Sequence, residues 1–223
     1  MDNKDFVANA SHELRTPLTI IRGFAETLQD LPHPTTEQLH EITGKILRTC
    51  SRLDHLIQSL LTLADLENRS EEPSKTCDLF LLVEECAHRL KTVHPEVKLI
   101  IKSDLSHAQV RANGDLLDLA LMNLLENGVK YSAPPANIEI TVKKVEETLH
   151  CSVKDRGIGI PALDLPRIFD RFYAVDKTRS RKLGGVGLGL SIVKTIVERY
   201  KGKVLVASEL GKGTTFTLLF PIR

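Results

Sequence analysis

The stretch LHEITGKILRTCSRLDHLIQSLLTL, residues 39–63, has apolar residues that step by three and four positions. Only Thr49 interrupts this seam. Such spacing places apolar side chains along one face of a helix, as in helices that pack on other helices. The stretch therefore predicts a long helix in a helical assembly. Its seam positions are Leu39, Ile42, Ile46, Leu53, Leu56, Leu60 and Leu63.

A second apolar seam lies upstream, and a turn separates it from the first. Residues 31–36 contain two prolines and predict that turn, so the two helices form a hairpin. Each helix presents one apolar stripe, and two helices alone bury little surface. We therefore expect a homodimer in which a second copy completes a four-helix bundle. The upstream seam comprises Val7, Leu14, Leu18, Ile21, Ala25 and Leu28.

Pro17 lies inside the upstream helical run. It has no amide hydrogen, so it cannot donate the helical bond to the carbonyl of Glu13. Because the apolar seam continues beyond Pro17, we expect a bend here rather than the end of the helix. A bend would lie next to His12, which the seam turns outward.

Downstream of the hairpin the apolar pattern changes. The polar residues 69–76 predict a linker between a helical domain at 1–68 and a second domain at 77–223. Strands and helices of the second domain do not alternate regularly, which predicts an α+β two-layer sandwich with helices on one face of a mixed sheet. We expect helices over 79–90, 114–131 and 190–200, and strands over 97–101, 138–145, 149–154, 203–207 and 214–220.

Composition limits the partners. Of 223 residues, 42% are hydrophobic and 26% charged, which is ordinary for a globular protein. The 30 Lys and Arg nearly balance the 29 Asp and Glu, so no basic field favours nucleic acid or an anionic membrane. The four cysteines show no CxxC spacing, which indicates reduced thiols in the cytoplasm. No apolar run approaches the roughly 18 to 20 residues that span a bilayer, so we expect any membrane sensor upstream of Met1.

His12 is the first candidate catalytic residue. The helical register turns it toward solvent or a partner domain, with Glu13 adjacent and Thr16 one turn further on the same face. A neutral imidazole offers one nitrogen as nucleophile while a carboxylate accepts the proton of the other. The group favours a nucleophilic histidine, and a plain solvated surface is the alternative.

Asn123, Asn127 and Lys130 fall on one face of the predicted helix 114–131. An amide oxygen is a suitable ligand for Mg²⁺, and lysine is a cation for phosphate. Together they indicate a metal and phosphate site. A solvated helix face is the alternative.

The segment DRGIGIP, residues 155–161, follows an alternating strand. A carboxylate at a strand end can accept a hydrogen bond from an exocyclic amine such as that of adenine. Gly157 and Gly159 leave room for a flat ligand beside the backbone. On its own this pattern is as typical of a turn.

The segment GGVGLGL, residues 184–190, directly precedes a predicted helix. Backbone amides at a helix start bind phosphate. The segment lacks the GK[ST] ending of a Walker loop and the strand setting of a Rossmann turn. The basic stretch at 176–182 before it predicts a mobile lid.

Six segments, taken in order, resemble the H, N, G1, F, G2 and G3 boxes of sensor histidine kinases. They are SHELRTP, NLLENGVKY, DRGIGIP, IFDRFY, GGVGLGL and GKGTTF, at 11–17, 123–131, 155–161, 168–173, 184–190 and 211–216. The resemblance extends from Phe6 to Phe220. It implies a dimerisation and phosphotransfer hairpin followed by a Bergerat-type ATP-binding domain. The first box is most similar to the group that includes the phosphate-regulon sensor.

The resemblance also implies roles for single residues. His12 would be the phosphoacceptor, Glu13 its base and Arg15 a phosphate contact, and Asn127 would hold Mg²⁺. The expected ATP-binding residues are Asn123, Lys130, Tyr131, Asp155, Gly157, Gly159, Gly185, Gly187 and Gly189, with Phe169 and Phe172 anchoring the lid against the nucleotide domain or the hairpin.

The implied activity is that of a protein-histidine kinase that uses ATP and Mg²⁺, phosphorylates His12 and passes the phosphoryl group to an aspartate of a response regulator receiver domain. The Glu13 to Thr16 spacing also implies phosphatase activity toward that regulator. Three positions depart from the family pattern, namely Arg156, Ala174 and Val186. Arg171 or Arg179 would replace a phosphate contact that Ala174 lacks. A gyrase- or chaperone-type ATPase and a non-catalytic dimeric scaffold are the alternatives.

Overall fold

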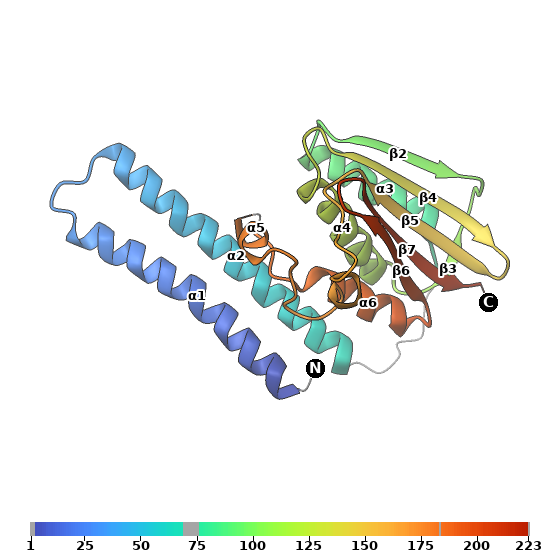
Figure 1. Cartoon of the computed structure of the whole chain (residues 1–223), viewed down its shortest axis with the longest axis horizontal. Helices are drawn as coiled ribbons and strands as arrows, with labels where there is room; N and C mark the ends of the chain where they lie inside the picture. The colour runs from blue at the N-terminus through green and yellow to red at the C-terminus, as the bar shows by residue number, and fades with distance from the viewer. Residues whose placement is uncertain (1–2, 69–75, 183, 223) are drawn as a thin grey trace.

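The computed structural model describes residues 3–68, 76–182 and 184–222 (Figure 1). The predicted linker at 69–76 lies outside the described residues except for Thr76. On its two sides, α2 ends at Asn68 and β1 begins at Thr76.

Two long helices form the N-terminal hairpin. Helix α1 covers Asn3–Asp30 and α2 covers Thr36–Asn68, and they run side by side in opposite directions (Figure 1). A capping box starts α2, because the amide of Thr35 donates to Gln38 Oε1 at 2.9 Å and the amide of Gln38 to Thr35 Oγ1 at 3.2 Å. The predicted hairpin and its turn are confirmed.

Pro17 lies inside α1, where its side chain is buried. The helix continues for 13 residues beyond it to Asp30, so the prediction that the helix does not end at Pro17 is confirmed. In the view of Figure 1, α1 passes Pro17 without a visible change of direction, so the predicted bend stays a prediction. Packing of the buried Pro17 ring supports the helix across the missing hydrogen bond, as tertiary contacts supply most of the stability of such helices.

The rest of the chain is built on a five-stranded mixed sheet. Its order is β2 (Lys98–Ser103), β4 (Asn137–Val145), β5 (Thr148–Asp155), β7 (Gly213–Pro221) and β6 (Lys203–Glu209). Only the β2 and β4 pair is parallel. A second sheet pairs β1 (Thr76–Asp78) with β3 (Gln109–Arg111), and the sequence did not predict it.

Three helices cover one face of the large sheet (Figure 1). They are α3 (Leu79–Val93), α4 (Gly114–Lys130) and α6 (Gly189–Arg199). Asp78 and Asn113 cap α3 and α4 by accepting from backbone amides of the first turn. The connection between β5 and α6 contains a short 3₁₀ helix, η1 (Leu165–Arg167), and α5 (Lys177–Lys182). The predicted two-layer sandwich is confirmed.

The hairpin and the sandwich share one buried core. Leu56, Leu63 and Leu66 of α2 belong to the same apolar cluster as α4 and α6. Helix α6 lies along α2, and Arg199 Nη1 donates to the carbonyl of Leu66 at 2.8 Å. The connection between β5 and α6 therefore faces the hairpin (Figure 1). Within the described ranges, no helix is both long and apolar enough to cross a membrane.

Candidate functional site

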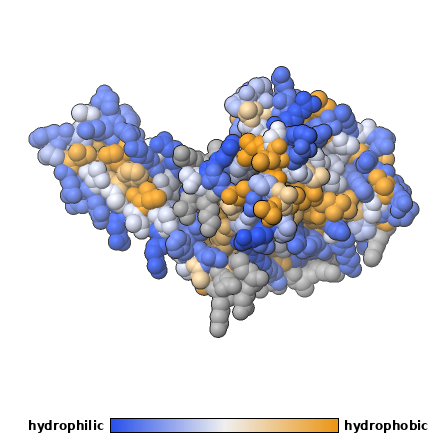
Figure 2. Space-filling view, viewed as in Figure 1, coloured by the Kyte–Doolittle hydropathy of each residue, from blue (hydrophilic) through white to orange (hydrophobic). Residues whose placement is uncertain are grey.

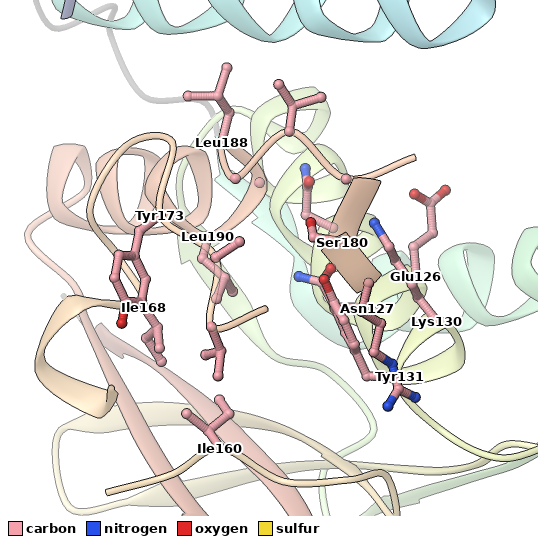
Figure 3. Close-up of a pocket in the computed structure, with 18 of the residues that line it drawn as sticks. Glu126, Asn127, Lys130, Tyr131, Ile160, Ile168, Tyr173, Ser180, Leu188 and Leu190 are labelled. Carbon is pink, nitrogen blue, oxygen red and sulfur yellow. The ribbon is translucent and has the colours of Figure 1, made fainter. Parts of the chain in front are cut away.

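A cavity of about 470 Å³ lies between α4, the end of β5 and the connection that contains α5 (Figure 3). Its lining includes most of the predicted nucleotide residues. These are Asn123, Asn127, Lys130, Tyr131, Asp155, Gly159, Gly185, Gly187 and Gly189. The N, G1 and G2 segments, which lie far apart in the sequence, thus meet at one hollow.

One side of the cavity is polar. Asn127, Lys130 and Ser180 point into it from α4 and α5 (Figure 3). Burial lowers the pKa of Lys130; the Glu126 carboxylate raises it, and the positive charge of Arg52 lowers it. Lys130 brings positive charge to this side, and Arg179, the residue before Ser180 on α5, also lines the cavity; both charges suit a polyphosphate.

The opposite side is apolar. Ile160, Ile168 and Leu190 project toward one another there, with Tyr173 beside them (Figure 3). A flat aromatic ring can pack between such side chains. The cavity therefore separates a place for a base from a place for phosphates.

Asp155 lies at the end of β5 and is buried. Its Oδ1 accepts from the amides of Gly157 at 2.8 Å and Thr214 at 3.1 Å. Burial raises the pKa of Asp155, and these two hydrogen bonds oppose that rise. Within the described part of the chain, both hydrogen bonds use Oδ1, which leaves Oδ2 to accept from a ligand amine.

The glycines of the cavity wall permit close packing. Gly187 has φ +76°, and a methyl group there would lie 2.7 Å from the carbonyl oxygen of Tyr173. A methyl group at Gly189 would lie 2.6 Å from Asn123 Oδ1. Gly157 is buried behind Asp155 and does not line the cavity. In this conformation its amide donates to Asp155, and the residue has no contact with the space that a ligand would occupy.

The predicted catalytic group lies on α1. His12 is exposed, and its Nδ1 is 3.9 Å from Glu13 Oε1. Thr16 Oγ1 donates to the carbonyl of His12 at 3.2 Å, and Arg15 is exposed. None of these four residues lines the cavity, whose hairpin side is formed by His55 and Ser59 of α2. The predicted catalytic group and the cavity are therefore separate in this conformation.

Phe169 and Phe172 lie outside the cavity lining. Phe169 packs edge-on against Phe216 of β7, with ring centroids 6.3 Å apart. Phe172 packs against Phe6 of α1 at 5.9 Å. One phenylalanine thus contacts the nucleotide domain and the other the hairpin.

The three departures from the family pattern differ in their placement. Ala174 and Val186 line the cavity, and so does Arg179. Arg156 is exposed near Glu139 of β4; the hydrogen bond from Lys102 lowers the pKa of that carboxyl, and the charge of Arg156 adds to the lowering. Arg171 pairs with Glu67 of α2 instead of lining the cavity. Of the two arginines expected to supply the phosphate interaction that Ala174 cannot make, only Arg179 is placed to do so here.

Sequence reasoning missed several lining residues. Thr214 and Phe216 belong to the GKGTTF segment, which carried a signal although neither residue was singled out. Ser180 lies in the basic stretch assigned to a lid. His55 and Ser59 carry no local signal, because only the docking of α2 brings them to the cavity.

The donor set fits a magnesium ion that arrives with a nucleotide. Mg²⁺ is commonly held by one or two protein oxygens together with substrate phosphates and waters. Asn127 offers an amide oxygen at the phosphate side. No group of three or more His, Cys, Asp or Glu suited to a metal occurs in the described part of the chain. The ion would therefore be held by Asn127 and phosphate oxygens.

Two families match the chain. The family described as "Histidine kinase-, DNA gyrase B-, and HSP90-like ATPase" matches residues 112–223, and "His Kinase A (phospho-acceptor) domain" matches residues 2–69. The sensor histidine kinase WalK of Bacillus subtilis is 35% identical over 100% of this chain and 37% of its own length. The chain spans 37% to 53% of the lengths of the first curated relatives.

Solved structures agree with the fold. The histidine kinase AdeS of Acinetobacter baumannii is 25% identical with a TM-score of 0.73, over 95% of this chain and 98% of that one. The histidine kinase ThkA, solved in complex with the response regulator protein TrrA, is 22% identical with a TM-score of 0.80. That match covers 98% of this chain and 61% of the other, and it supports the fold alone.

Proposed function

The chain belongs to the sensor histidine kinases of two-component systems, and on that premise we propose that it phosphorylates His12 with ATP and passes the phosphoryl group to a response regulator. The observation that carries the proposal is the cavity that joins Asp155 on one strand end to Asn127 and Lys130 on α4.

The two sides of the cavity support ATP as the substrate. Asp155 Oδ2 would accept from the exocyclic amine of adenine, whereas guanine presents an oxygen there and leaves the carboxylate unpaired. The apolar side would hold the base, and Lys130 with Arg179 would contact phosphates. A bound Mg²⁺, held by Asn127, would supply charge neutralisation for the transfer.

In the transfer step His12 Nε2 attacks the γ-phosphorus of ATP. The bond from phosphorus to the β,γ-bridging oxygen breaks, and ADP leaves with that oxygen. The Nδ1 proton passes to the carboxylate of Glu13, which lies beside it. Because the cavity faces α2, the ATP-binding domain moves relative to the hairpin before His12 is reached.

A response regulator is the proposed acceptor because the chain belongs to a two-component family, and ThkA, which has the same fold, is solved in complex with the response regulator protein TrrA. We also propose that Thr16 orients a water molecule toward the aspartyl phosphate of the regulator. Its hydroxyl hydrogen is given to the carbonyl of His12, which leaves the oxygen free to accept from that water. Thr16→Ala would then slow dephosphorylation of the regulator without stopping autophosphorylation.

We propose that the hairpin dimerises. Apolar side chains remain uncovered along it (Figure 2), and they are those of Val7, Leu18, Ile20, Leu39, Leu47, Ile57 and Leu61. A second copy would bury them in a four-helix bundle. Leu47→Glu should shift the chain toward monomer in light scattering. Leu163→Glu is the control, because Leu163 is 91% exposed in the other domain.

Two further assignments belong to the same proposal. The division into a hairpin at 1–68, a linker at 69–76 and an ATP-binding domain at 77–223 is supported by the end of α2 at Asn68 and the start of β1 at Thr76. Cytoplasmic placement is supported by four free cysteines and by the use of ATP.

The main test uses γ-labelled ATP with Mg²⁺. Wild-type protein should take up label that is stable in base and lost in acid, as expected for phosphohistidine. His12→Gln should abolish the label, whereas His40→Gln, an exposed histidine on α2, should keep it. Phosphate release without labelled protein would favour the ATPase alternative, and acid-stable label would exclude His12 as the acceptor.

A further inference from the structure

The carboxylate of Glu13 lies between two groups. Its Oε1 is 3.9 Å from His12 Nδ1, and its Oε2 is 4.0 Å from Arg52 Nη2 of α2. The side chains of Glu13 and Arg52 are 21% and 26% exposed, whereas that of His12 is 72% exposed. Arg52, a half-buried arginine of α2, thus lies near one oxygen of the Glu13 carboxylate, and His12 lies near the other.

Arg52 also lies at the junction with the nucleotide cavity. His55, three residues further along α2 and on the same face, lines that cavity. Burial is the main cause of the lowered pKa of Lys130 on the phosphate side, and the positive charge of Arg52 adds to that lowering. Arg52 is therefore close both to the His12 and Glu13 pair and to the side of the cavity that fits phosphates.

The chemistry of the group suits a supporting role. A guanidinium is planar, permanently charged and able to hold a carboxylate oxygen in a fixed direction. A nucleophile and its base work best when a third group orients the base. Contacts of this kind are often long before substrate binds and shorten in the reacting complex.

We propose that Arg52 is a positioning residue for phosphoryl transfer to His12, and that it acts by holding one oxygen of Glu13 while the other stays on His12 Nδ1. The inference rests on the proposed function in that His12 is taken as the phosphoacceptor. During transfer the new bond forms from phosphorus to Nε2, the bond to the leaving group breaks, and the Nδ1 proton moves to Glu13.

The test uses two phosphoryl donors to distinguish an effect on the reactivity of His12 from an effect on the ATP-binding domain. ATP requires the nucleotide cavity, whereas phosphoramidate is a small donor that reacts directly with an imidazole and releases ammonia. Arg52→Gln should lower the rate constant of His12 phosphorylation about tenfold with either donor, with the KM for ATP unchanged within about twofold. Arg52→Lys should restore part of the rate, because it keeps the charge but not the planar fork.

Two controls show whether Arg52 acts through Glu13. Arg48→Gln removes an exposed arginine one turn earlier on α2 and should leave both rates unchanged. In a Glu13→Gln background, Arg52→Gln should have no further effect, since residues that act as a unit are not additive. Circular dichroism and nucleotide binding of each variant check that the fold is kept.

Three results would overturn the inference: wild-type rates for Arg52→Gln with both donors, a raised KM for ATP with kcat unchanged, or full additivity with Glu13→Gln. The proposed function can fail separately. A wild-type protein labelled by phosphoramidate but not by ATP would contradict the kinase assignment and would still report on Arg52. Absence of label from both donors would overturn both.

Discussion

In the proposed function, the side chain of Asp155 selects the nucleotide. Its Oδ1 is already used by two backbone amides, so the proposed recognition of adenine rests on Oδ2. In Asp155→Asn the amide oxygen would keep the two backbone bonds, and the NH₂ group would face the ligand in place of Oδ2. The introduced NH₂ group and the exocyclic amine of adenine are both donors, so no hydrogen bond could form between them. We expect ATP affinity to fall by about a hundredfold or more.

Titration calorimetry with a non-hydrolysable ATP analogue would measure this change. Asp104→Asn, an exposed loop residue, is the matched control and should bind normally. Acidification should act in the same way, because the ionised form of Asp155 is the acceptor. Since burial raises its pKa, affinity should begin to fall at a higher pH than for an ordinary aspartate. Unchanged ATP affinity in Asp155→Asn would show that the side chain of Asp155 does not recognise adenine.

Two glycines of the G2 segment permit a comparison of strain with clash. Gly184 and Gly187 both have positive φ, at +73° and +76°. A methyl group at Gly184 would meet none of the described atoms within 4 Å, whereas at Gly187 it would lie 2.7 Å from the carbonyl oxygen of Tyr173. Gly184→Ala should therefore cost only about 1 kcal/mol of backbone strain. Gly187→Ala should cost distinctly more.

Thermal unfolding of both variants, with and without the ATP analogue, would measure the two costs. Equal losses of stability would mean that the clash with Tyr173 is relieved by a shift of the loop. The two glycines also show how far sequence alone can predict the importance of a residue in this segment. The glycine cluster marked the segment, but the clash that makes Gly187 necessary involves Phe172 and Tyr173, which lie 15 and 14 residues earlier in the chain.

At the scale of elements, periodicity predicted the long helices and the five strands of the large sheet well. It missed β1 and β3, which are three residues each and too short to show an alternating pattern. It also missed α5, whose six residues KTRSRK carry no apolar stripe. Strands β1 and β3 form because they pair with each other, and a local pattern does not contain that information. Helix α5 has a local cap, since Asp176 Oδ1 accepts from the amides of Thr178 and Arg179, but apolar periodicity does not detect a cap.

Pro17 departs from the residues that normally form a helix interior, and this departure yields a prediction about the stability of α1. Proline inside a helix costs about 3 kcal/mol relative to alanine, because it removes a donor and crowds the preceding turn. Pro17→Ala should therefore stabilise the hairpin by about 1 to 3 kcal/mol, the lower value applying if packing of the buried ring is reduced. Chemical denaturation followed by circular dichroism would measure it. Pro32→Ala, in the turn between the helices, should instead have little effect or destabilise slightly.

If Pro17→Ala leaves stability unchanged, α1 already tolerates the proline without cost. If stability rises, the natural sequence keeps a less stable helix beside His12, the proposed phosphoacceptor. Hydrogen exchange of residues 10–20 would then locate the gain in the turn around His12.

At the scale of the whole molecule, six short segments predicted which residues meet but not how the two units dock. The sequence predicted Asp155, Asn127 and the glycines at 184, 185, 187 and 189, because each lies in a short segment with its own sequence pattern. His55 and Ser59 were not, because docking of α2 against α6, together with the pairing of Glu67 with Arg171, brings them to the cavity. Contacts between distant parts of the chain set that placement, and no window of sequence contains both sides.

The contact between Phe6 and the 168–173 segment gives the whole-molecule prediction. Phe6 lies 5.9 Å from the ring of Phe172, and the guanidinium of Arg171 lies 4.8 Å above its ring while pairing with Glu67. The start of α1 thus holds the ATP-binding domain directly. Phe6→Ala should weaken this docking by about 1 to 2 kcal/mol, because it removes one aromatic pair and one cation–π interaction.

Hydrogen exchange of residues 168–175 and 186–190 should therefore become faster in Phe6→Ala, and exchange within the large sheet should not change. Val7→Ala, at the exposed neighbouring position, is the control. In the proposed function the cavity leaves α2 before it reaches His12, so weaker docking should also raise the initial rate of autophosphorylation. Unchanged exchange in 168–175 would mean that α2 alone holds the domain. Faster exchange with a lower rate would mean that the docked arrangement is on the path to transfer, so that Phe6 assists the reaction instead of restraining it.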